Sequence, residues 1–106
     1  MFVHCVYFWL REDLTEAEHL RFVEGVRSLT TIETVRNGFV GRPADTDRPI
    51  IDRSYSYGLV VAFENRKGHD AYQEHPAHDE FRDNCAGFWT QVKIYDFETM
   101  QSSEIL

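Results

Sequence analysis

The segment Phe2–Leu10 constrains the fold more than any other part of the chain, because it is apolar on both faces. It consists almost entirely of residues that favour β-strands. Side chains in a strand alternate between two faces, which here carry Phe2, His4, Val6, Phe8 and Leu10 on one side and Val3, Cys5, Tyr7 and Trp9 on the other. Neither set suits water, so the pattern predicts a strand whose two faces are both covered.

The rest of the chain predicts three more strands and three helices. Thr15 and Glu18 form a capping box, which predicts a helix that runs to about Leu29. Asn65 is suited to cap a second helix, which Pro76 stops or kinks. The remaining expected elements are strands at Glu33–Val40, Ser54–Glu64 and Trp89–Phe97, a polar loop at Gly41–Arg53, and a helix from about Ala77.

This order of elements predicts an α+β fold, the ferredoxin-like split βαβ unit, with a four-stranded antiparallel sheet and helices on one face. An irregular α+β fold is the alternative. The chain of 106 residues is expected to form a single domain over residues 1–98, followed by a loose polar tail at 99–106. One-sided helices leave the second sheet face open, so we expect a second copy of the chain to cover it as a homodimer.

Charge and composition exclude several classes of function. Eleven Lys and Arg residues against 18 Asp and Glu residues give a net charge of −7, which disfavours a nucleic-acid partner. The apolar opening lacks a basic flank and a cleavage site, so it predicts neither a signal peptide nor a membrane segment, and a cytoplasmic location is expected. Cys5 and Cys85 lack Cys-x-x-Cys spacing and are expected to be free thiols.

Four side chains are candidates for a site between the sheet and the helices. His78 shares an apolar stripe at helical spacing with Phe81, Cys85 and Phe88, which predicts an inward-pointing imidazole. His4 belongs to the two-sided first strand, and the hydroxyl groups come from Tyr57 and Tyr72. Such groups can form a His/Tyr acid–base pair that binds a small molecule. The competing interpretation is that the same residues only pack the core.

Other catalytic and binding motifs are missing from the sequence. His69, His75 and His78 are close together, but Pro76 interrupts the helix that would align them, so we predict no metal site. The sequence has no Gly-x-Ser-x-Gly motif and no glycine-rich phosphate loop, so no cofactor is expected either.

Several of these residues together form a recognisable motif. The segment Tyr72–His78 reads Tyr-Gln-Glu-His-Pro-Ala-His, and Phe88-Trp89 and the strand 92–96 follow it. With the histidine of the first strand and the Leu14-Thr15-Glu16 helix start, this pattern resembles the stress-responsive dimeric α/β-barrel (Dabb) family. The resemblance implies a ferredoxin-like unit that pairs through its sheet into a dimeric α+β barrel.

The resemblance also implies a chemistry for the candidate residues. A cofactor-free plant enzyme of this family closes a polyketide ring by an aldol step. By position, His78 matches its base, Tyr72 matches its assisting tyrosine, His4 matches a further pocket histidine, and Tyr57 replaces a histidine. The expected function is binding of a small aromatic or polyketide-like molecule, with cyclase or lyase activity in which His78 is the general base. A non-catalytic, stress-associated protein and a cofactor-free monooxygenase remain the alternatives.

Overall fold

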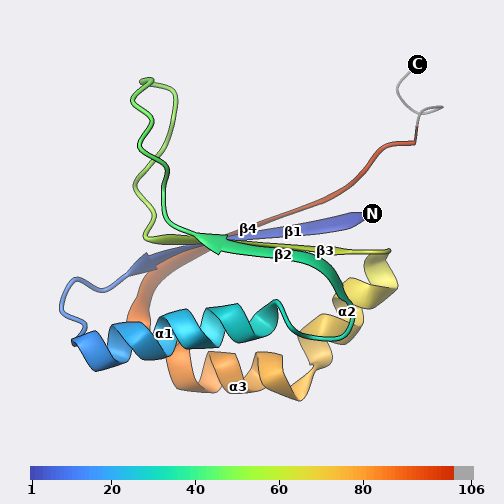
Figure 1. The fold of residues 1–106 in the computed structure, drawn as a ribbon, viewed down its shortest axis with the longest axis horizontal. Helices are drawn as coiled ribbons and strands as arrows, with labels where there is room; N and C mark the ends of the chain where they lie inside the picture. The colour runs from blue at the N-terminus through green and yellow to red at the C-terminus, as the bar shows by residue number, and fades with distance from the viewer. Residues whose placement is uncertain (102–106) are drawn as a thin grey trace.

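The computed structural model describes residues 1–101 and contains a four-stranded antiparallel sheet with its helices on one face (Figure 1). The strands lie in the order β2-β3-β1-β4. Their bounds are β1 Phe2–Leu10, β2 Val35–Gly41, β3 Tyr57–Phe63 and β4 Trp89–Glu98. The helices are α1 Glu16–Leu29, α2 Arg66–Glu74 and α3 Pro76–Cys85, and a 3-10 turn, η1 Ala86–Phe88, leads into β4. This topology confirms the predicted ferredoxin-like fold.

The helix ends lie close to where the sequence predicted them. Thr15 and Glu18 form the reciprocal capping box at the start of α1. The side chain of Asn65 accepts a hydrogen bond from the amide of Gly68 and so caps α2. Pro76 ends α2 and occupies the first turn of α3, where its missing N–H costs no hydrogen bond.

The core lies between the sheet and the helices. Alternate residues of β1 and β3 are buried there, as the alternation in the sequence predicted. From α1 the buried residues are Phe22, Val26 and Leu29, and α3 adds Phe81 and Cys85. Both cysteines are free, as expected.

The strands β2 and β3 begin later than the sequence predicted. β2 begins at Val35 rather than at Glu33, and a register shift between Val35 and Asn37 makes its pairing with β3 irregular. β3 begins only at Tyr57, because Ser54 and Tyr55 still belong to the connection from β2. Tyr55 therefore does not share the buried face with Tyr57, and its ring packs 5.0 Å from that of Tyr7 on the opposite face of the sheet.

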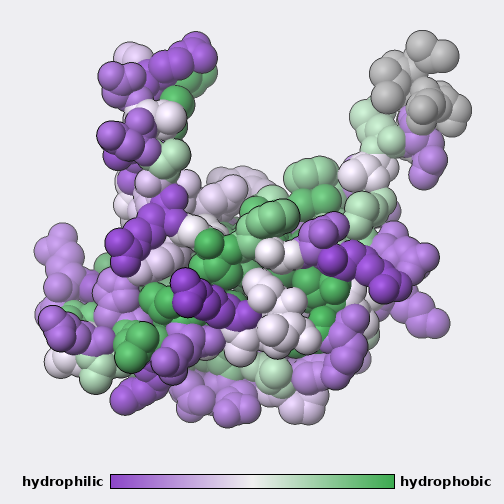
Figure 2. Space-filling view, viewed as in Figure 1, coloured by the Kyte–Doolittle hydropathy of each residue, from purple (hydrophilic) through white to green (hydrophobic). Residues whose placement is uncertain are grey.

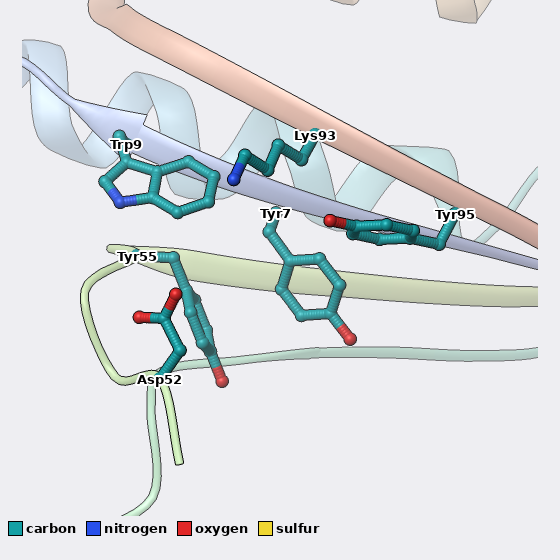
Figure 3. Close-up of a pocket in the computed structure, with 6 residues that line it drawn as sticks. All are labelled: Tyr7, Trp9, Asp52, Tyr55, Lys93 and Tyr95. Atoms are coloured by element: carbon teal, nitrogen blue, oxygen red, sulfur yellow. The ribbon is translucent and has the colours of Figure 1, made fainter. Parts of the chain in front are cut away.

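The face of the sheet opposite the helices is open in the single chain. The connection between β2 and β3 stands out from this face (Figure 1), and its surface is largely hydrophilic (Figure 2). At its base a hollow of about 310 Å³ is lined by aromatic and charged side chains (Figure 3), namely Tyr7, Trp9, Asp52, Tyr55, Lys93 and Tyr95. Tyr95 and Phe97 of β4 and Phe39 of β2 are more than half exposed.

The end of β4 is tied to the start of the chain. The amide of Thr99 donates to the carbonyl of Met1 at 2.8 Å, and the terminal amine of Met1 donates to the Thr99 hydroxyl at 2.6 Å. The loose tail expected at 99–106 therefore begins with a bonded residue, and its residues 102–106 lie outside the described part. Within residues 1–101 no helix has the length and apolar character needed to cross a membrane.

Candidate functional site

A cavity of about 520 Å³ lies between the sheet and helices α2 and α3. This volume is within the usual range for a small-molecule site. Its walls are mainly apolar and are formed by Val6, Phe8, Leu29, Leu59, Phe81, Ala86, Trp89, Val92 and Ile94. The polar lining consists of His4, Tyr72, Gln73, His78 and Arg82. Three of the four candidate residues, His4, Tyr72 and His78, therefore line one cavity.

Tyr72 and His78 are brought together by the junction between α2 and α3. His75 ends α2, where its amide donates to the carbonyl of Tyr72 at 3.2 Å. The same residue begins α3, where its Nδ1 accepts the amide of Ala77 at 3.0 Å. Its Nε2 lies 3.2 Å from a carboxylate oxygen of Glu33. The rings of Tyr72 and His78 consequently meet edge to face, with centroids 5.1 Å apart.

Burial sets the protonation of this pair. Burial is the largest influence that lowers the pKa of His78 below its ordinary value of 6.5, and the positive charge of Arg82 adds to it. The imidazole is therefore mostly neutral at pH 7 and can accept a proton. Its Nδ1 is buried without a hydrogen-bond partner in the described structure. Burial also raises the pKa of Tyr72, which keeps the phenol protonated as a hydrogen-bond donor.

His4 is held by a residue that the sequence analysis did not single out. Its Nδ1 lies 2.5 Å from Oδ1 of Asp96, which is the partner of His4 in the register of β1 and β4. A neutral His4 that donates its Nδ1 proton to this carboxylate has its lone pair on Nε2. Only the long-range pairing of two strands brings these residues together, so no local signal identifies Asp96.

The structure does not bring Tyr57 to the cavity, which corrects its expected place beside His4. Tyr57 begins β3 under the first turns of α1, and its hydroxyl lies 2.6 Å from Nε2 of His19. Nε of Arg42 donates to the same hydroxyl at 3.2 Å. Phe8, the cross-strand partner of Tyr57, lines the cavity, whereas Tyr57 lines a separate hollow beside α1 together with His19 and Arg42.

The three histidines considered for metal binding do not form a cluster. His75 is occupied as a helix cap, and His78 lines the cavity. His69 instead lies beside His4, with ring centroids 4.9 Å apart. A ring nitrogen of each of these two histidines and a carboxylate oxygen of Asp96 all lie within 4.8 Å of one another. The sequence analysis missed this group because its members come from three separate elements.

The buried histidines predict how stability depends on pH. Burial lowers the pKa of both His4 and His78 below 6.5, so the unfolded chain binds their protons more readily than the folded one. These groups do not reduce the free energy of unfolding above pH 6.5, but they reduce it progressively as the pH falls below 6.5. We expect the Tm to fall between pH 6.5 and 5, and His78→Gln to reduce that slope. Scanning calorimetry measures Tm against pH, and an equally steep fall in the wild type and in His78→Gln would contradict this role of His78.

Comparison with known proteins agrees with this fold. The model of the family described as "Stress responsive A/B Barrel Domain" matches residues 2–99. A stress-response A/B barrel domain-containing protein of Arabidopsis thaliana is 25% identical over 96 residues, which cover 91% of this chain and 84% of that protein.

Two solved structures are similar over almost the whole chain. A Dabb family protein with a ferredoxin-like fold from Mesorhizobium loti has a TM-score of 0.74 and 25% identity, covering 94% of this chain and 97% of its own. A dimeric protein of unknown function from Bacteroides fragilis has a TM-score of 0.69 and 25% identity, with 92% and 95% covered. With the ferredoxin-like topology and the match to residues 2–99, these similarities show that the chain belongs to the stress-responsive A/B barrel (Dabb) family.

Proposed function

We propose that the protein binds a small aromatic or polyketide-like carbonyl compound in the cavity and removes a proton from the carbon next to the carbonyl. The observation that carries this proposal is the imidazole of His78, which lines an apolar cavity of about 520 Å³ edge to face with the Tyr72 ring and has no hydrogen-bond partner at its Nδ1 among the described residues. A neutral imidazole without a competing hydrogen bond is suited to act as a general base.

The reaction needs only the groups that line the cavity. His78 takes the α-proton, and the electron pair of the broken C–H bond moves onto the carbonyl oxygen to form an enolate. Tyr72 donates a hydrogen bond to that oxygen, which stabilises the developing charge. In a cyclisation the enolate carbon then attacks a second carbonyl of the same molecule. The proton on His78 passes to the new alkoxide, so the base is restored.

The volume of the cavity favours this function over a purely structural role. If His4, Tyr72 and His78 only packed the core, the space beside their rings would be filled by other side chains, as it is around Phe22. Instead, ordinary apolar side chains surround a space large enough for a ring system. Arg82 and Gln73 are exposed and line it as well, and they provide polar contacts toward the solvent.

Proton removal is tested by incorporation of deuterium. The protein is incubated in D₂O with a panel of aryl ketones and short poly-β-ketones, and deuterium at the α-carbon is followed by NMR. We expect exchange above the buffer rate for compounds that also raise the Tm. A panel that binds without exchange would contradict the chemistry. Oxygen consumption with phenols, measured in parallel, would instead indicate the oxygenase alternative.

We also propose that the open sheet face pairs with the same face of a second copy. The face carries exposed aromatic residues, of which Phe39 is 68%, Tyr95 58% and Phe97 54% exposed. Several exposed aromatic side chains on one face are typical of an interface. The similar structure from Bacteroides fragilis is described as dimeric, which supports a dimer here.

A charge in the middle of this face is expected to prevent pairing. Val60 lies on the open face between Cys5 of β1 and Phe39 of β2. Val60→Glu would place an unpaired carboxylate in the interface, and we expect dimer affinity to fall about a hundredfold or more. Analytical ultracentrifugation measures this loss. Leu20→Glu on the exposed side of α1 is the matched control and is expected to remain dimeric. A dimeric Val60→Glu protein would exclude this face.

A further inference from the structure

A third side chain, the imidazole of His69, lies beside His4 and is not used in the proposed function. The imidazole of His69 in α2 is only 7% exposed and stacks on Phe2, with ring centroids 4.3 Å apart. Its Nδ1 lies 3.1 Å from Oδ1 of Asp70. Its Nε2 is buried and has no hydrogen-bond partner among the described residues. A buried polar atom without a partner is costly, and a bound ion is one way to satisfy it.

The neighbours of His69 supply the other parts of a metal site. One ligand atom from each of His4, His69 and Asp96 lies within 4.8 Å of the other two. The distance from His4 Nδ1 to Asp96 Oδ1 is 2.5 Å, and with the upper limit of 4.8 Å the group spans a range that includes the roughly 3.3 Å expected between ligands of a tetrahedral zinc ion. Asp96 is exposed, so its carboxylate has room to rotate. Small side-chain shifts therefore suffice to surround an ion.

The Asp70 carboxylate strengthens this interpretation. A histidine that binds a metal through one nitrogen almost always donates its other N–H to a carboxylate or carbonyl, which fixes the tautomer and orients the ring. The contact between His69 Nδ1 and Asp70 has this form and leaves the lone pair on the unpartnered Nε2. Two imidazoles and one carboxylate, with further positions open, are the ligand set of catalytic zinc and non-haem iron sites.

We propose that His4, His69 and Asp96 bind one divalent transition-metal ion, with Asp70 orienting His69. The ion replaces the hydrogen bond between His4 and Asp96 and gives His69 Nε2 a partner. Because His4 also lines the cavity, the ion lies at the cavity wall. This site is separate from the general-base role of His78, and its test needs no substrate.

Metal binding is measured by calorimetry on tag-free, chelator-treated full-length protein titrated with Zn²⁺. Titration with Co²⁺ adds visible absorption as a readout of coordination. We expect one ion per chain. His69→Gln and Asp96→Asn are expected to weaken binding at least about a hundredfold, and Asp70→Asn about 10- to 100-fold, because outer-shell partners have effects of that size. His19→Gln, which changes a histidine bonded to Tyr57 in a hollow that contains none of the three ligands, is expected to leave the affinity unchanged within about twofold.

Several results would overturn the site. One is that the wild-type chain does not bind Zn²⁺. Another is that Zn²⁺ binding survives both His69→Gln and Asp96→Asn. A third is that His19→Gln loses as much affinity as these variants. If the buried His69→Gln variant does not fold, Asp96→Asn still tests the site, because it changes an exposed side chain without altering its shape. Near-ultraviolet circular dichroism checks that each metal-free variant is folded. If the protein exchanges deuterium but binds no metal, only the metal site is rejected. If it binds metal but does not catalyse exchange, only the proposed chemistry is rejected.

Discussion

His78→Gln is expected to slow α-proton removal by about 10²- to 10⁴-fold, which is the usual contribution of a positioned general base. Glutamine is polar and of similar length, but it cannot accept and hold a proton near neutral pH. The loss should appear in kcat rather than in KM, because the apolar walls that bind the substrate are unchanged. In the wild type, burial lowers the pKa of His78, so the rate should rise with pH and reach half of its plateau value below pH 6.5.

The partner variant Tyr72→Phe separates the two roles. It retains the ring that packs on His78 but removes the hydroxyl, and we expect a loss of about 10²-fold, as for removal of one oxyanion donor. His19→Gln, a histidine outside the cavity, is the control and should retain the wild-type rate. Deuterium incorporation followed by NMR measures all three proteins. A His78→Gln protein that exchanges as fast as the wild type would remove His78 from the mechanism.

Phe22→Ala is expected to destabilise the protein by about 3–5 kcal/mol, the usual cost of removing a buried aromatic ring. Phe22 is 0% exposed, and its ring centroid lies 5.2 Å from that of Phe8 and 5.5 Å from that of Tyr57. The same ring supports Phe81 and Trp89, which form part of the cavity wall. Ligand binding should therefore weaken together with stability.

Urea denaturation at one protein concentration measures this effect, because dimer formation would make the free energy of unfolding depend on concentration. Leu20→Ala is a matched control two positions earlier in α1, where the side chain is 57% exposed. We expect it to change stability by less than about 0.5 kcal/mol. A loss below about 1 kcal/mol for Phe22→Ala would mean that the helix layer repacks around the missing ring.

The sequence was sufficient to predict most of the fold because its signals are local. The capping box at Thr15, the cap at Asn65 and the break at Pro76 each act within a few residues, and the structure has all three. The ends of β2 and β3 were less predictable. There the polar connection competes with strand pairing, and only the register with neighbouring strands decides where each ladder stops.

The candidate site was predictable only in part. Tyr72 and His78 belong to one short motif, so their proximity follows from two adjoining helices. Asp96 reaches His4 through strand pairing between opposite ends of the chain, and His69 reaches both from a helix. Tyr57 lies on the same buried face of the sheet as the residues that line the cavity. Its position along β3, however, places its hydroxyl beside His19. Alternation predicts a face but not a location on that face.

The single residue between α2 and α3 gives the spacing of the motif a geometric meaning. His75 caps both helices, so neither can gain or lose a residue there without losing a cap. Each added residue turns a helix by about 100°, which would carry Tyr72 or His78 out of the cavity. The interval of six positions between them is therefore as much a part of the site as the two side chains. In a redesigned chain, the apolar wall can be varied to accommodate ligands of other shapes, whereas the length of this junction has to be conserved.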